Sequence, residues 1–148
     1  MELKGNHNIN ASAQKVWDLL MDPEVLAKIT PGISKLELIG PDQYDAIAMV
    51  KMGPVKGSFK GSLTVQEKQE PHHFSLLISQ KSKIGNVSAT VAIDINEVSE
   101  NSCEVAFDGK AKLSGLLART GQRVLSGVAN TLSKQFFSAL EKEVNPIQ

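Results

Sequence analysis

Hydrophobic and polar residues alternate with a period of two along the middle of the chain, from Ile33 to Leu113. This period is typical of β-strands that have one dry and one solvated face. Short clusters of Gly, Pro, Asp and Asn interrupt the alternation and are typical of turns. The pattern predicts six strands whose short connections favour antiparallel pairing, and these strands cover about residues 33–40, 43–52, 55–69, 72–82, 86–98 and 102–113.

Different patterns flank this region. Leu3 to Asn10 alternates weakly and predicts a first strand, which is followed by a helix over about residues 13–21. Asp22-Pro23-Glu24 then begins a second short helix, with proline in its first turn. Ser114 to Val144 carries apolar residues at helical spacing and predicts one helix roughly 45 Å long. The order of elements predicts an α+β fold, in which a seven-stranded antiparallel sheet packs one face against the terminal helix.

The strand predicted over residues 55–69 has an unusual dry face. Three of the seven residues in this row are glycines, although a glycine inside a strand normally weakens it. One interpretation is curvature, because a long strand that bends around a helix needs flexible positions. The other is volume, because absent side chains leave a hollow between sheet and helix, and the two interpretations are compatible. The row consists of Gly53, Val55, Gly57, Phe59, Gly61, Leu63 and Val65.

The neighbouring strands also mix small residues with medium-sized aliphatic ones on their dry faces. The chain has one Trp, one Tyr and five Phe, fewer large side chains than a strongly curved sheet and one helix would normally need. We therefore expect a partly hollow, apolar interior that binds a hydrophobic small molecule. The residues expected to contact this ligand are Tyr44, Ala48, Val50, Gly57, Phe59, Gly61, Leu76, Val91, Phe107, Leu117, Gly121, Val124 and Val128.

The terminal helix is predicted to have two unlike halves. Its first half contains Gly115, Gly121 and Gly127, and each glycine costs about 1 kcal/mol relative to alanine inside a helix. Close approach of helix and sheet is one explanation for these glycines. A thinly packed, mobile half at the entrance of the pocket is the other. Phe136 and Leu140 are expected to close the core at the second half.

Composition narrows the class of protein. A length of 148 residues predicts a single domain over residues 1–148, and 16 Lys and Arg balance 16 Asp and Glu. A neutral chain lacks the basic field that nucleic-acid binding needs. One cysteine excludes an internal disulfide and a cysteine zinc cage. No run of about 18 apolar residues and no signal-peptide pattern occurs, so we expect a cytoplasmic protein.

Candidate chemistry is sparse, and the sequence predicts no catalytic residue, metal ligand or cofactor. His72 and His73 are adjacent at a predicted turn and point to opposite faces of a strand, so they are poorly placed to share one metal. Cys103 lies on a dry row, which favours a buried, inert thiol. No pair of acids lies on the dry face for acid–base work. An enzyme acting on an apolar substrate would have to use Tyr44 or His7 as its polar group.

Several motifs together resemble the family of the CoxG subunit of carbon monoxide dehydrogenase, which belongs to the START/Bet v 1-like superfamily. The most specific is the segment Gly53-Pro54-Val55-Lys56-Gly57-Ser58-Phe59-Lys60-Gly61. The others are Val16-Trp17, Asp22-Pro23-Glu24-Val25-Leu26-Ala27, Ile29-Thr30-Pro31-Gly32, Gly127-Val128-Ala129 and Gln135-Phe136-Phe137. The resemblance covers essentially the whole chain. It implies a helix-grip fold, in which a curved antiparallel sheet grips a long C-terminal helix around an apolar cavity.

The resemblance also implies a function. Members of the family are associated with carbon monoxide dehydrogenase and related molybdenum hydroxylases as maturation, membrane-recruitment or quinone-carrying accessories. We therefore expect a non-catalytic accessory protein that holds a quinone- or lipid-like molecule. An adaptor that acts through a surface patch without a ligand is the alternative. Contact with a membrane is expected to be peripheral, because the chain ends at Gln148 without the tail that tethers longer relatives.

Overall fold

Seven antiparallel strands form one sheet, and the strands lie in the order β1-β7-β6-β5-β4-β3-β2. The computed structural model describes residues 1–144, so the end of the chain at Gln148, on which the expectation about a tether depends, lies outside the described residues. The strands are β1 (Glu2–Ile9), β2 (Ile33–Gly40), β3 (Gln43–Met52), β4 (Val55–Gln69), β5 (His73–Ser82), β6 (Gly85–Ser99) and β7 (Ser102–Leu113). The predicted strands and their antiparallel pairing are confirmed, and β1 joins the sheet beside β7.

Two short helices, α1 (Ala13–Leu20) and α2 (Pro23–Ile29), connect β1 to β2 as predicted. Ser12 is the N-cap of α1, and its hydroxyl accepts a hydrogen bond of 3.1 Å from the backbone N–H of Lys15. Asp22 caps α2 in the same way through the N–H of Glu24, at 3.0 Å. Such caps satisfy backbone donors that have no partner inside the helix. The local sequence therefore defines where both helices begin.

The terminal helix is two helices, so the prediction of one continuous helix over 114–144 is wrong. α3 (Gly115–Arg119) ends before Thr120, and α4 (Gln122–Val144) begins after Gly121. Gly121 has a φ of +103°, which lies outside the right-handed helical region and is tolerated by glycine because it has no Cβ. The apolar spacing continues across this break, so periodicity alone gave no sign of it.

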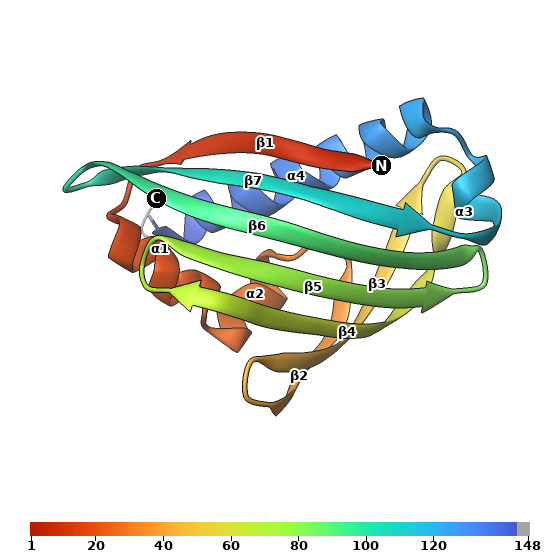
Figure 1. The fold of residues 1–148 in the computed structure, drawn as a ribbon, viewed down its shortest axis with the longest axis horizontal. Helices are drawn as coiled ribbons and strands as arrows, with labels where there is room; N and C mark the ends of the chain where they lie inside the picture. Colours follow the sequence, from red (N-terminus) through yellow and green to blue (C-terminus); the bar gives the residue numbers. More distant parts are fainter. Residues whose placement is uncertain (145–148) are drawn as a thin grey trace.

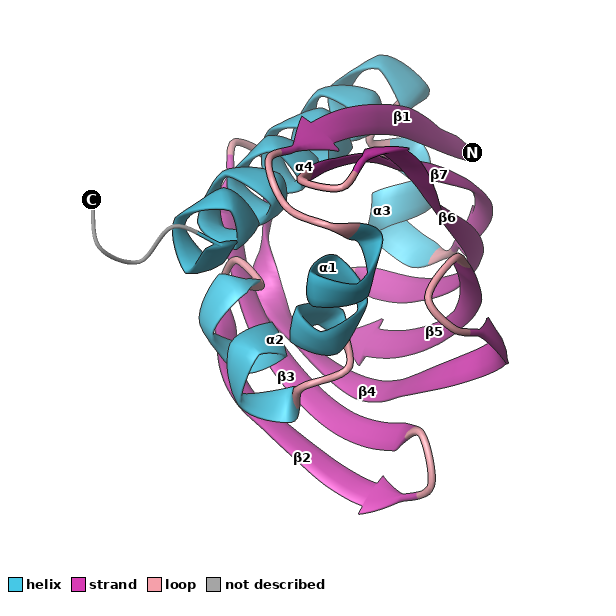
Figure 2. Ribbon diagram, turned by 90° about the vertical axis from the view of Figure 1, so that its left-hand side faces the viewer, coloured by secondary structure: helices cyan, strands magenta, loops and turns pink. Residues whose placement is uncertain are grey.

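The sheet curls around α4, so that the strands form a curved wall on one side of the helix (Figures 1 and 2). α1 and α2 cover one end of the grip, and α3 lies at the other end beside the β5–β6 turn (Figure 1). The interior therefore has two halves along the axis of α4. We call the half next to α1 and α2 the packed half and the half next to α3 the hollow half.

Aromatic residues fill the packed half. Six of the seven aromatic side chains belong to its core or pack against it, and Phe59 is the exception. Trp17 meets Phe74 edge to face, with ring centroids 5.6 Å apart. On α4 the buried ring is that of Phe137, which is 6% exposed, whereas Phe136 is half-buried. The expectation that Phe136 closes the core therefore needs correction by one position, while Leu140 is buried as expected.

Candidate ligand-binding cavity

The hollow half contains a cavity of about 370 Å³ between the sheet and the first turns of α4. Its wall is formed by side chains of β1 and β3–β7, of α3 and α4, and of the segment that joins α2 to β2. Five alanines contribute to the wall, where larger aliphatic residues would fill the space; they are Ala46, Ala48, Ala89, Ala111 and Ala129. The predicted hollow interior is therefore present, confined to one half of the grip.

Five of the thirteen residues expected to contact a ligand lie on the wall of this cavity, namely Ala48, Val50, Phe59, Leu117 and Val128. The other eight lie elsewhere. Tyr44, Leu76 and Phe107 belong to the packed half. Val91 is buried on β6 but does not line the cavity. Gly121 and Val124 lie at the exposed α3–α4 junction, and the side chain of Val124 is 40% exposed.

The two central glycines of β4 do not face empty space. A Cβ on Gly61 would collide with the carbonyl oxygen of Ser79 and would lie 2.9 Å from the Cα of Gln80. A Cβ on Gly57 would lie 3.6 Å from the Cδ1 of Ile84, whose side chain occupies that space. Gly61 therefore permits close approach of β4 and β5, and the prediction that it faces the cavity is wrong. Of the two interpretations of this row, the structure favours backbone geometry over volume.

Two polar side chains interrupt the otherwise apolar wall, Thr30 and Gln80. The Thr30 hydroxyl donates a hydrogen bond of 2.6 Å to the carbonyl of Leu26. The Oε1 atom of Gln80 is buried and has no hydrogen-bond partner, a state that costs about 1–3 kcal/mol. Sequence reasoning missed Gln80, although it continues the dry row of Phe74, Leu76 and Ile78 on β5. That parity was the available signal.

Other titratable groups of the interior are poorly placed for catalysis in the cavity. Burial, and then the charge of Asp42, raise the pKa of the Tyr44 phenol, which lies in the packed half. Burial raises the pKa of the Cys103 thiol, with a further contribution from Glu97, so the thiol is held protonated. Within residues 1–144, no group of three or more His, Cys, Asp or Glu side chains is arranged to hold a metal ion.

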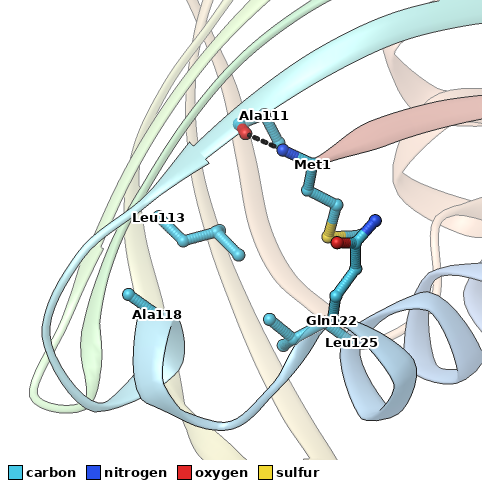
Figure 3. A pocket seen from close by; sticks show the side chains of 6 residues that line it. All are labelled: Met1, Ala111, Leu113, Ala118, Gln122 and Leu125. Carbon is cyan, nitrogen blue, oxygen red and sulfur yellow. Dashed lines mark hydrogen bonds between the residues drawn. The ribbon is translucent and has the colours of Figure 1, made fainter.

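A smaller depression of about 190 Å³ lies beside the cavity, between the edge of β7 and the α3–α4 junction (Figure 3). It shares Met1, Ala111, Leu113 and Leu125 with the cavity wall. The Met1 nitrogen donates a hydrogen bond of 3.0 Å to the carbonyl of Ala111, and its side chain extends toward Gln122 (Figure 3). This depression is the side of the hollow half that is nearest to solvent at the helix break.

α3 is held firmly at its own place beside the cavity. The backbone N–H of Leu117 donates a hydrogen bond of 2.8 Å to the carbonyl of Ile84, in the β5–β6 turn. The Ser114 hydroxyl accepts a bond of 3.0 Å from the N–H of Asn86. Leu117 itself is 3% exposed. The flexible element at this end is therefore the Thr120-Gly121 link, rather than α3.

Basic residues surround the open end of the hollow half, although the chain as a whole is neutral. The segments 46–66, 71–93 and 109–140 contain no Asp or Glu, and they supply all of these cations. Every one of them is exposed, and within residues 1–144 none forms an ion pair. We call this group the basic rim; it consists of Lys51, Lys56, Lys60, Lys81, Lys83, Lys110, Lys112, Arg119 and Arg123.

Among the described residues, no helix is both long and apolar enough to cross a membrane. Two exposed apolar side chains lie next to the arginines of the basic rim, Leu116 at 56% and Val124 at 40% exposure. This end of the molecule therefore presents cations and apolar groups together.

The curved sheet, the gripped C-terminal helix and the cavity between them define a protein of the START/Bet v 1-like, helix-grip class. A START superfamily protein from Mycobacterium smegmatis superposes with a TM-score of 0.77 at 14% identity, with 99% of each chain covered. An aromatase/cyclase from a Streptomyces species gives a TM-score of 0.69 at 14% identity, covering 98% of this chain and 93% of that one.

The family is given by the sequence itself. A family model that describes the CoxG subunit of carbon monoxide dehydrogenase matches residues 5–145, and the chain belongs to this family. A conserved protein from Geobacillus kaustophilus is 32% identical, with a TM-score of 0.95 over 99% of this chain and 96% of that one. No curated protein sequence matches the chain. The resemblance noted in the sequence is therefore confirmed at the level of family and fold.

Proposed function

We propose that this protein is a non-catalytic accessory protein of the cytoplasm that binds a quinone- or lipid-like molecule in its hollow half. The observation that carries the proposal is the cavity of about 370 Å³ with its almost wholly apolar wall. Sites for small organic ligands usually have volumes of about 300–1,000 Å³ and are mostly apolar. Each Å² of apolar surface removed from water contributes about 25 cal/mol to binding, which favours a hydrophobic ligand.

The absence of converging reactive groups supports binding rather than turnover. A general acid or base has to lie within hydrogen-bond reach of the reacting atoms. No acidic or basic side chain lines the cavity within the described residues, and His7 is stacked on Phe137 in the packed half. An enzyme working in this cavity would have only Gln80 and Thr30 as polar groups. The carrier function needs no further group.

The partner that we propose is a carbon monoxide dehydrogenase or a related molybdenum hydroxylase. The support for this step is the description of the family to which the chain belongs. In this proposal the accessory protein receives or delivers its apolar ligand at the redox enzyme. The alternative function, an adaptor that acts through its surface without a ligand, would leave the cavity without a role.

We further propose that the basic rim makes peripheral contact with an anionic lipid surface, where ligand is exchanged. A Lys or Arg near such a surface contributes about 1 kcal/mol. Arg119 and Arg123 lie beside the exposed side chains of Leu116 and Val124, and apolar side chains can insert between lipid headgroups. An apolar ligand would then pass between cavity and bilayer without crossing bulk water.

Native mass spectrometry of freshly purified protein tests the carrier function against the adaptor alternative. The carrier predicts a fraction of the protein with a bound mass that is released by organic solvent and identified as a hydrophobic small molecule. Protein that carries no such mass and takes up none when incubated with detergent-solubilised quinones and lipids would support the adaptor.

Vesicle co-sedimentation tests the membrane contact. Vesicles with an anionic lipid should bind the protein, and salt should weaken the binding because it screens charge. Reversing Arg119 and Arg123 to Glu should reduce binding roughly tenfold or more. Lys134 and Lys142 lie further along α4, so reversing both to Glu gives a control with the same change of net charge. Equal losses in the two double variants would contradict a role for the basic rim.

A further inference from the structure

Gln80 lies on the floor of the cavity, near the end of β5. It pairs with Gly61 of β4 on one side and with Val87 of β6 on the other. Because Gly61 has no side chain, the backbone of β5 approaches β4 closely at this point. The carboxamide of Gln80 therefore projects from a part of the sheet that is held at a fixed position.

The unpartnered oxygen of Gln80 is unusual for a buried group. Buried polar side chains in folded proteins almost always have a hydrogen-bond partner. Among the described residues, Gln80 Oε1 is the one buried side-chain atom without such a partner. Thr30, the other polar residue of the wall, already donates its hydrogen to Leu26. The wall therefore holds a single polar group with free hydrogen-bonding capacity.

We propose that Gln80 is the polar anchor of the cavity and selects a neutral amphiphile, with an apolar body and one hydroxyl or carbonyl oxygen. The inference rests on the proposed binding function and narrows its ligand class. A carboxamide both donates and accepts hydrogen bonds, and a half-turn of its terminal torsion exchanges the two atoms. A hydroxyl or a carbonyl of the ligand can therefore satisfy the group.

The same wall disfavours ligands with a charged head. No Lys, Arg or His side chain lines the cavity within the described residues. A carboxylate placed beside Gln80 would lose its hydration without gaining a compensating charge. The cavity therefore discriminates a phenol, alcohol or quinone from a fatty-acid carboxylate of similar size.

The test uses three rigid probes of equal ring size: naphthalene, 2-naphthol and 2-naphthoate. Their dissociation constants are measured by displacement of a fluorescent apolar dye at pH 7. The wild-type protein should bind 2-naphthoate at least tenfold more weakly than 2-naphthol. In Gln80→Met, which keeps the length of the side chain, affinity for 2-naphthol should fall roughly three- to tenfold relative to that for naphthalene.

Two further variants separate anchoring from a structural role. Gln80→Asn keeps the carboxamide on a shorter side chain and should retain part of the preference for 2-naphthol. Ile78→Val removes a methyl group from the wall two residues away and should change both affinities alike. An unchanged ratio in a folded Gln80→Met protein that binds both probes overturns the anchor and leaves the carrier function standing. If no probe binds the wild type, the proposed function fails first.

Discussion

The rings of His7 and Phe137 stack with their centroids 4.2 Å apart and their planes at 19°. His7 belongs to β1 and Phe137 to α4, so this stack joins the edge of the sheet to the helix. Phe107 of β7 extends it, with a centroid 6.0 Å from that of Phe137. The stack belongs to the packed half, and the second half of α4 is fixed there. The first half of α4 is left to cover the cavity.

Phe137→Ala should therefore destabilise the protein by about 3–5 kcal/mol, the usual cost of truncating a buried phenylalanine. Phe136→Ala should cost clearly less, because Phe136 is half-buried. Urea unfolding followed by the fluorescence of Trp17 measures both free energies. The opposite ranking would mean that Phe136 is the core residue after all.

The break between α3 and α4 gives a matched pair of glycine variants. Gly121 has a positive φ, so Gly121→Ala should destabilise the protein by about 1–2 kcal/mol. Gly127 lies inside α4, and a Cβ there meets nothing within 4 Å. Gly127→Ala should therefore stabilise the protein by about 0.4–1 kcal/mol. Thermal unfolding of the two variants checks both signs, and stabilisation by Gly121→Ala would indicate a continuous helix.

The glycines of β4 give a second pair. Gly61→Ala places a methyl group against the backbone of Ser79, and the resulting overpacking should cost about 1–3 kcal/mol or more. At Gly57 the nearest atom to a new Cβ lies at an ordinary contact distance of 3.6 Å. Gly57→Ala should therefore be neutral or stabilise the strand by about 0.5–1 kcal/mol. Equal stability of the two variants would contradict the close approach of β4 and β5 at Gly61.

The alternation of residues was sufficient to predict every strand and the face that each side chain takes. It could not show how far along a strand the interior is filled. Tyr44 and Val50 share one row of β3, yet Tyr44 lies in the packed half and Val50 lines the cavity. Their difference depends on which helix residue lies opposite, and that is a tertiary property.

Parity also leaves the cause of a glycine undecided. Gly57 and Gly61 both belong to the dry row, but one faces a side chain and the other a backbone. The break at Gly121 was similarly hidden, because apolar spacing is compatible with a helix that stops and begins again. Gln80, in contrast, could have been found by extending the dry row of β5 by one step. A polar residue in such a row is a signal worth following.

The central claim is that the hollow half binds a hydrophobic molecule, and filling it tests this most directly. Ala89 of β6 lines the cavity, so Ala89→Leu should occupy space without exposing apolar surface. Ala92 lies three residues along the same strand on the opposite face, and Ala92→Leu is the control. The measurement is the dissociation constant of 2-naphthol for both variants, after thermal unfolding has shown that they are folded. We predict that Ala89→Leu weakens binding at least tenfold and Ala92→Leu leaves it unchanged. Wild-type affinity in a folded Ala89→Leu protein would contradict the account.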